Sequence, residues 1–421
     1  MRILFLSQFF SPEPFFKALP FATALANRGH SVEALTGFPN YPGGRLYSGY
    51  RVRAWQRETL EGIPITRVPL YPSHDRSIIR RTLNYTSFAV SASLLGPFLV
   101  GRPDVAYVYH PPATVGLPAW VLKTLKGIPF VYDIQDLWPD TIDASEMMTG
   151  SLPLAAIRRW CSFVYRQADH LTVISPGFRK ILVSRGVPED KISVIYNWCD
   201  EANIHPVEPD EGLRMRLGLS GSFVVMFAGT MGLAQGLDVI LDVAALCATV
   251  NRSIRFVFVG GGVERSRLEA KAAGRSNVQF LPPCPMEEVS RLLALADVQL
   301  VHLKDKPLFR ITIPSKTQAS MAAAKPLLMA VSGEAAELVR RSGAGLTAQP
   351  DNAPDIARAI IEMASLSPER LREMGSRGRS FYLQEMSMEV GISRYEQLFQ
   401  SVIALARRNG EAVRSGPGLV P

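Results

Sequence analysis

Several features that define other protein classes are missing from this sequence of 421 residues. Its four cysteines stand singly, without C-x-x-C spacing, which argues against a zinc site or a disulfide framework. It has no G-x-x-x-x-G-K-[S/T] loop and no G-x-G-x-x-G loop, so neither a Walker-type nucleotide site nor a nicotinamide site is predicted. Zinc fingers and aromatic-basic binding motifs are also missing, and we expect no nucleic-acid partner.

The composition is that of an ordinary globular protein. Hydrophobic residues make up 47% and charged residues 20% of the chain, which excludes a largely disordered or collagen-like protein. The length predicts two to three domains. The first apolar run ends at Ser7-Gln8 without a small-residue cleavage site, so we expect a buried strand there and not a signal peptide.

Acidic residues are scarce in the first third of the chain. Residues 1–130 hold 14 Lys and Arg but only 6 Asp and Glu, so this part carries the whole net charge of +8. No charged residue occurs between Arg81 and Arg102. That uncharged stretch fits a transmembrane helix, a buried domain helix or a helix in the membrane interface. Arg76, Arg80 and Arg81 keep the interface alternative open beside the buried helix, because cations suit anionic headgroups.

Strand and helix patterns alternate through both halves of the chain. Near-continuous apolar runs such as RILFLSQF and PFVYDIQD predict buried parallel strands, and helices are expected between them, for example over 15–28 and 77–100. The fold class is therefore α/β, with two doubly wound, Rossmann-like domains. Further strands are predicted from these segments: HSVEALTG, IPITRVPL, DVAYVYH, HLTVIS, ISVIYN, SFVVMFAGT, IRFVFVGGG, NVQFLP, DVQLVHL and PLLMAV.

In such domains, ligands bind in the loops that follow the carboxyl ends of the strands. Three residues in these loops of the first domain could act on a substrate hydroxyl: Glu13, His110 and Asp136. Glu13 could instead stabilise a helix start, His110 could be structural, and Asp136 could form an Asx-type cap. Asp136 belongs to a group of acidic residues around Trp138, whose indole could stack on a sugar ring. We expect no metal site there. The other carboxylates of this group are Asp133, Asp140 and Asp143.

The second half has loops suited to a diphosphate. Pro314-Ser315-Lys316 begins a helix whose first amides could bind phosphate beside Lys316 and Arg310, although a serine cap with solvated cations would give the same pattern. Glycine-rich loops at AGTMGLAQGLD and VGGG would let the backbone approach a nucleotide. The predicted donor and phosphate residues are Gly229, Thr230, Gly232, Gln235, Gly260, Arg310, Ser315, Lys316 and Gln318.

Six segments in this order resemble glycosyltransferase family four, of the GT-B fold, and look most like bacterial N-acetylfucosamine-type transferases of O-antigen and capsule assembly. The resemblance covers roughly residues 1–400. The segments are SQFFSPEPFF, LANRGHSVEALTGFPNYPGGRLYSGY, DLWPD, VIYNWCDE, AGTMGLAQGLD and IPSKTQASMAAAKP.

The resemblance implies two domains that face a central cleft. Residues 1–200 would bind the acceptor, residues 201–380 would bind the nucleotide-sugar donor, a helix over 380–405 would pack back on the first domain, and 408–421 would form a flexible tail. Several family positions differ here. The E-x7-E pair is Ile311 and Ala319, the diphosphate-gripping Arg and Lys are Thr230 and Gln235, and a frequent histidine is Gln135.

The predicted activity is metal-independent transfer of an N-acetylated amino or deoxyamino sugar from UDP to a polyprenyl-diphosphate-linked saccharide, without a cofactor. The basic first domain would bind an anionic membrane, which places the enzyme in the cytoplasm, peripherally on the inner face of the cell membrane. Two alternatives stay open: an inactive nucleotide-sugar-binding scaffold of a polysaccharide assembly complex, and a UDP-sugar epimerase of the same fold.

Overall fold

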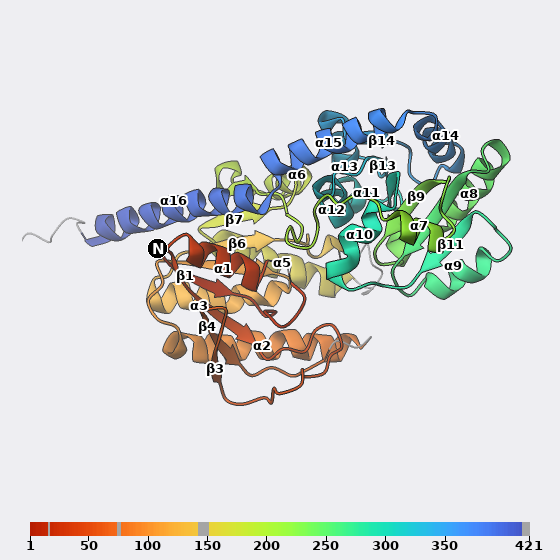
Figure 1. Cartoon of the computed structure of the whole chain (residues 1–421). Helices are drawn as coiled ribbons and strands as arrows, with labels where there is room; N and C mark the ends of the chain where they lie inside the picture. The colour runs from red at the N-terminus through yellow and green to blue at the C-terminus, as the bar shows by residue number, and fades with distance from the viewer. Residues whose placement is uncertain (16, 74–76, 142–150, 415–421) are drawn as a thin grey trace, which may run out of the picture. The chain divides into compact units, whose positions relative to one another are not determined.

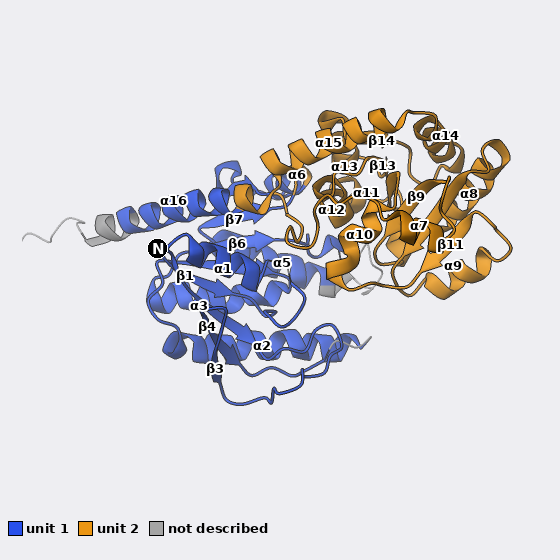
Figure 2. Ribbon diagram, in the orientation of Figure 1, with its two compact units in different colours: residues 1–174, 178–195, 392–421 blue, residues 175–177, 196–391 orange. Residues whose placement is uncertain are grey.

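The computed structural model divides into two compact units, shown in different colours in Figure 2. Unit 1 comprises residues 1–174, 178–195 and 392–421, and unit 2 comprises residues 175–177 and 196–391. The structure describes residues 1–15, 17–73, 77–141 and 151–414. Each unit is built around its own β-sheet (Figure 1).

Unit 1 contains an eight-stranded sheet in the order β3-β4-β2-β1-β5-β6-β7-β8. All neighbouring strands are parallel except β3 and β4, which form an antiparallel pair. Its strands are β1 (Arg2–Leu6), β2 (Ser31–Gly37), β3 (Gln56–Leu60), β4 (Ile63–Val68), β5 (Val105–His110), β6 (Phe130–Ile134), β7 (His170–Val173) and β8 (Ile192–Val194). Its helices include α1 (Leu19–Asn27), α2 (Ile78–Leu99), α3 (Gly116–Lys126), α5 (Ser151–Gln167) and α6 (Pro176–Ser184).

Unit 2 contains a six-stranded parallel sheet in the order β11-β10-β9-β12-β13-β14. Its strands are β9 (Phe223–Ala228), β10 (Ile254–Val259), β11 (Val278–Leu281), β12 (Val298–His302), β13 (Leu327–Ala330) and β14 (Gly345–Thr347). Its helices are α7 (Glu211–Arg216), α8 (Asp238–Val250), α9 (Arg265–Lys271), α10 (Val289–Ala294), α11 (Pro307–Arg310), α12 (Ser315–Ala322), α13 (Glu334–Ser342), α14 (Ala353–Ala364) and α15 (Pro368–Glu385).

This strand order confirms the predicted pair of doubly wound, Rossmann-like units. In each sheet the order reverses between two central strands, β1 and β5 in unit 1 and β9 and β12 in unit 2. Loops that leave the carboxyl ends of such strands diverge and leave room for a ligand. Every residue of β5, β6, β12 and β13 is buried, as expected for parallel strands covered on both faces.

Strands β3 and β14 were not predicted from the sequence. Strand β3, with the sequence QRETL, lies at the sheet edge, and its polar residues give no apolar run. A tight turn at Glu61 and Gly62, both with positive φ, joins it to β4 as a hairpin. Strand β14 has only three residues, too few for a pattern.

The C-terminal helices differ from the prediction in their boundaries. The expected helix over 380–405 is in fact two helices, because α15 ends at Glu385 and α16 (Met388–Arg414) begins after a short break. The boundary between the two units falls within α16, because residues from Ile392 onward belong to unit 1. The predicted tail from 408 begins too early, since α16 continues to Arg414, and residues 415–421 lie outside the described residues.

Helix α2 is the uncharged stretch of the sequence. It begins after the Ser77 cap, whose hydroxyl accepts a hydrogen bond from the Arg80 amide, and it packs on β2, β4 and α3. In the parts of the chain that the structure describes, every helix is too short or too polar to cross a membrane. The transmembrane alternative for this stretch is therefore wrong.

Candidate active site

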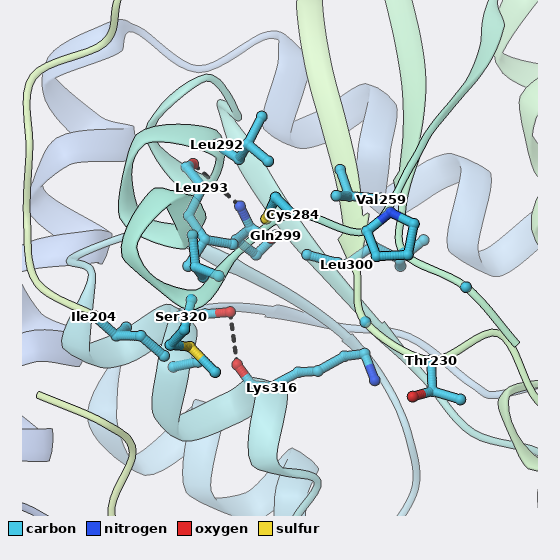
Figure 3. A pocket seen from close by; sticks show the side chains of 18 residues that line it. Ile204, Thr230, Val259, Cys284, Leu292, Leu293, Gln299, Leu300, Lys316 and Ser320 are labelled. Carbon is cyan, nitrogen blue, oxygen red and sulfur yellow. Dashed lines mark hydrogen bonds between the residues drawn. The ribbon is translucent and has the colours of Figure 1, made fainter. Parts of the chain in front are cut away.

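Unit 2 holds a cavity of about 320 Å³ at the carboxyl edge of its sheet, where the strand order reverses (Figure 3). The loops after β9 and β10 form one wall, and α10 and α12 form others. Most lining side chains are apolar, with a few polar groups among them, as is usual in sites for small organic molecules. The lining includes Ile204, Gly229, Thr230, Gly260, Pro283, Cys284, Leu292, Gln299, Lys316, Ala319 and Ser320.

The two glycine-rich loops pack directly against each other. A Cβ atom on Gly260 would lie 2.2 Å from the Gly229 carbonyl oxygen, and one on Gly262 would lie 2.3 Å from that of Met231. Both Gly260 and Gly262 have φ in the positive range that side chains disfavour. The Met231 amide also donates to the Gly261 carbonyl at 2.7 Å. The glycines therefore bring two backbone segments together to form the cavity wall.

Lys316 supplies the cation of the cavity. Its side chain leaves the first turn of α12 and extends toward Thr230 (Figure 3), with Nζ 4.8 Å from the centre of the Phe227 ring. A Cβ on Gly229 would lie 2.9 Å from this Nζ, so the glycine leaves room for the ammonium group. Burial lowers the pKa of Lys316 to about 8. A cation held against a helix N-terminus and loop amides suits a phosphate group.

The other predicted donor residues divide into two groups. Gly229, Thr230 and Gly260 line the cavity with Lys316, whereas five further residues lie outside its lining: Gly232, Gln235, Arg310, Ser315 and Gln318. Gln235 accepts a hydrogen bond from the Gly232 amide at 3.0 Å and so shapes the loop. Arg310 is exposed and forms two 2.8 Å hydrogen bonds with Asp305. These bonds hold the Arg310 guanidinium at Asp305, outside the cavity lining.

Helix α10 and the loop before it were missed as part of the site. Cys284, Met286, Val289, Leu292 and Leu293 line the cavity, although none belongs to a recognised ligand motif. Their segment follows β11, whose carboxyl end lies at the same sheet edge as those of β9 and β10. That topological position was the only signal in the sequence that could have indicated their role.

In unit 1, Glu13 is buried and binds backbone amides. Its carboxylate accepts hydrogen bonds from the amides of Phe10 at 3.0 Å, Asn40 at 2.8 Å and Tyr41 at 2.8 Å. Burial raises the pKa of Glu13 to about 7 in spite of these hydrogen bonds. Helix α1 starts only at Leu19, so Glu13 does not stabilise a helix start. Its carboxylate holds the loops after β1 and β2 together.

Asp136 lies just after β6 and is largely buried, and burial raises the pKa of its carboxyl group to about 6. Within the described residues its carboxylate has no hydrogen-bond or ion-pair partner, so the predicted Asx-type cap is not formed. Trp138 stands beside it, with its ring 5.6 Å from that of His110 and 6.4 Å from that of Tyr85. A carboxylate of raised pKa beside partly buried aromatic rings can bind a sugar hydroxyl and take its proton.

His110 is buried at the end of β5. Burial lowers its pKa to about 3, so the imidazole is neutral at physiological pH, and its Nδ1 has no hydrogen-bond partner. The ends of β1, β5 and β6 are neighbours in the sheet, which brings Glu13, His110 and Asp136 to one edge. No hydrogen bond joins these three side chains to one another in the part of the chain that the structure describes.

The other carboxylates of the acidic segment have different surroundings. Asp133 is fully buried and accepts hydrogen bonds from Lys17 at 3.2 Å, Thr172 at 2.8 Å and Gln135 at 2.7 Å, as well as from Tyr107. Asp140 pairs with Arg185, and Asp143 lies outside the described residues. Among the described residues, no three His, Cys, Asp or Glu side chains are grouped as metal ligands.

Two doubly wound, Rossmann-like units, one of which holds a cavity suited to phosphate, are the architecture of the GT-B fold. Residues 18–198 match the model "Glycosyl transferase 4-like domain", and residues 222–365 match "Glycosyl transferases group 1". The chain therefore belongs to the family of GT-B glycosyltransferases that combine these two domains.

Individual relatives agree with this assignment. WbjE of Pseudomonas aeruginosa, named as a glycosyltransferase, is 27% identical over 70% of this chain and 74% of its own length. WcaI of Escherichia coli K12, named as a colanic acid biosynthesis glycosyl transferase, is 28% identical over 66% and 70%. The structure of Anabaena HepE in complex with UDP-glucose superposes with a TM-score of 0.69 at 16% identity, covering 95% of this chain and 100% of HepE. The likeness to HepE shows a common fold.

Proposed function

We propose that this enzyme transfers a sugar, an N-acetylated amino or deoxyamino sugar, from UDP to a polyprenyl-diphosphate-linked saccharide in bacterial surface polysaccharide synthesis. The cavity beside Lys316 carries the proposal. Unit 2 would bind the nucleotide sugar, and unit 1 would bind the acceptor and the anionic membrane surface. The activity named for WcaI supports a role in polysaccharide synthesis, and the UDP-glucose bound by HepE supports a UDP-linked donor.

The donor half of the reaction depends on charge at the leaving group. When the bond between the sugar and the diphosphate breaks, negative charge develops on the departing phosphate oxygen. Lys316 and the amides at the start of α12 and in the loop after β9 can stabilise this charge. Ala319, which stands where many family members have a carboxylate, lines the same cavity. Because no carboxylate stands at position 319, other polar groups must bind the ribose. Ser320 and Thr230 line the cavity and are candidates.

The acceptor half depends on Asp136 as the group that orients and deprotonates the attacking hydroxyl. Its carboxylate, which has no partner among the described residues, and its raised pKa suit a general base, and Trp138 offers a surface on which a sugar ring can stack. Glu13 and His110 would support the same loops from within. Both are buried, which favours a structural role for them over direct contact with the substrate.

A panel of nucleotide sugars tests the proposal. Purified enzyme is incubated with UDP-, GDP- and dTDP-linked sugars and bacterial membrane extract, and release of nucleoside diphosphate is measured. We expect release from a UDP-linked amino sugar that requires the extract. Consumption without extract would indicate an epimerase or a hydrolase, and binding without release would indicate a scaffold.

Replacing Lys316 by alanine should weaken UDP binding about 10- to 100-fold, because a charge-assisted hydrogen bond to phosphate is lost. Isothermal titration calorimetry measures the change directly. Arg310→Ala is the matched control, since Arg310 lies nearby but is exposed and paired with Asp305. We expect the control to change affinity by less than about threefold. Unchanged affinity in Lys316→Ala would contradict the phosphate assignment.

UDP affinity should also fall as the pH rises. With a pKa of about 8, Lys316 loses its proton between pH 7 and 9, so UDP would bind about tenfold more weakly at pH 9 than at pH 7. The phosphates of UDP stay ionised over this range and do not contribute. Lys316→Arg keeps its charge throughout and should bind with nearly constant affinity. Calorimetric titration of UDP into the unmodified protein and into Lys316→Arg at pH 7, 8 and 9 tests this pH dependence.

A further inference from the structure

Helix α2 presents apolar side chains on two opposite faces, and the rest of unit 1 covers one of them. Phe88, Ala89, Ala92 and Gly96 are buried against the unit. The opposite side is exposed over the whole length of the helix. Its large apolar residues, with their exposed fractions, are Ile79 (74%), Leu83 (49%), Val90 (51%), Leu94 (65%) and Phe98 (85%).

These five residues lie along one side of the helix, where the exposed Thr86 stands between Leu83 and Val90, and we call this side the exposed face of α2. Their separations of three to four residues, or twice that, place them within about 100° of the helix circumference. The stripe is about 28 Å long at the usual rise per residue. Large apolar side chains gathered along one exposed side of a surface helix indicate a binding site.

Cationic side chains flank both ends of the stripe, and α2 contains no acidic residue. Arg80 is exposed in the first turn. At the other end, Arg57 donates to the Leu99 carbonyl at 3.2 Å and lies 5.6 Å from the centre of the Trp55 ring. Trp55 is itself 48% exposed, and Arg102 is exposed just beyond the helix. An apolar stripe bounded by cations and an indole has the composition of a membrane-interface helix.

We propose that the exposed face of α2 lies in the headgroup region of an anionic bilayer, parallel to its plane. Charge complementarity selects this occupant. In a symmetric dimer through the same face, the arginine-bearing ends of the two helices would approach each other, which disfavours a second copy of the chain. An anionic lipid surface neutralises both ends at once and takes up the apolar side chains between them.

This proposal rests on the proposed function, because it gives the surface a role in acceptor binding. Tyr85 lies on the inner side of α2, and its ring is 6.4 Å from that of Trp138, next to Asp136. Its carbonyl also accepts a hydrogen bond from Thr114, in the loop after β5, at 3.2 Å. The same helix therefore contacts the bilayer and the candidate acceptor site. A saccharide on a lipid carrier would reach Asp136 without leaving the membrane.

Vesicle flotation of the full-length protein tests the surface. We expect binding to vesicles of phosphatidylglycerol and phosphatidylcholine at low salt, and weak binding to phosphatidylcholine alone. Leu94→Asp/Phe98→Asp should lower the binding constant more than about tenfold, since it puts charge where apolar contact is needed. Leu405→Asp is the matched control, because Leu405 is 56% exposed on α16 of the same unit. It should bind like the unmodified protein.

Two further measurements make the outcomes distinct. UDP affinity is measured for each variant, and we expect it to be unchanged; failure of the unmodified protein to bind UDP would count against the proposed function and not against the surface. Light scattering measures the oligomeric state. The membrane proposal is overturned if the unmodified protein does not bind anionic vesicles, if the double variant binds them equally well, or if the double substitution converts a dimer into a monomer.

Discussion

Replacing Asp136 by asparagine is expected to lower kcat by a factor of about 10² to 10⁴ while leaving the affinity for UDP unchanged. The amide keeps the size and hydrogen-bonding capacity of the side chain but cannot take a proton from the acceptor hydroxyl. The cavity proposed for UDP lies in unit 2, and Asp136 belongs to unit 1, so we expect UDP binding not to respond to the substitution. Nucleoside diphosphate release and calorimetry with UDP separate the two effects.

The pH profile gives an independent readout of the same carboxylate. With a pKa of about 6, Asp136 is ionised above pH 6 and protonated below it, so kcat/KM should fall about tenfold per pH unit below pH 6. In Asp136→Asn, kcat/KM should not show this fall below pH 6. Asp140→Asn is the control in the same segment, since Asp140 pairs with Arg185. If Asp140→Asn lowered kcat as strongly, the base would have been assigned to the wrong residue.

Replacing Lys17 by methionine should lower the free energy of unfolding by about 3–5 kcal/mol. Lys17 and Asp133 are fully buried and 3.2 Å apart, so removing the ammonium group leaves a carboxylate without a counter-charge inside the unit. Lys17 Nζ also lies 3.2 Å from the Tyr395 hydroxyl, which joins α16 to the same cluster. Urea unfolding followed by circular dichroism measures the change.

A second substitution tests the cause of that loss. In Lys17→Met/Asp133→Asn the uncompensated charge is absent. The amide oxygen can still accept one of the two hydrogen bonds that Tyr107 and Thr172 donate to separate carboxylate oxygens, so we expect this protein to be more stable than Lys17→Met alone. Arg372→Ala removes an exposed partner of Glu369 and should have no measurable effect. Equal stability of the single and double variants would mean that packing, and not charge, sets the cost.

The proposed reaction requires cations for a leaving diphosphate, and the structure narrows the choice between the two that the sequence offered. Lys316 and Arg310 lie six residues apart and both stand close to the start of α12. Lys316 enters the cavity, whereas Arg310 points to solvent and binds Asp305. A side chain's direction depends on where its helix packs, which spacing along the chain does not show.

The sequence by itself determined the architecture of this protein. Buried apolar runs of strand length, alternating with helices, allow few arrangements other than parallel sheets covered on both faces, because each run must be shielded from water. The same reasoning placed Asp136, Lys316 and the glycine-rich loops at the carboxyl edges of the sheets. It failed at β3, whose pairing comes from a hairpin at the sheet edge and not from an apolar pattern.

Only the tertiary structure decided which polar side chains are engaged and which are available. Glu13 accepts hydrogen bonds from the amides of residues 40 and 41, and Asp133 pairs with Lys17, which is 116 positions away. Among the described residues, the Asp136 carboxylate has no such partner. Likewise, most of α2 is a single uncharged stretch in the sequence. In the structure one face of this helix is buried against unit 1 and the opposite face is exposed. Hydrogen-bond partners and burial arise from segments brought together by folding, so local sequence patterns cannot reveal them.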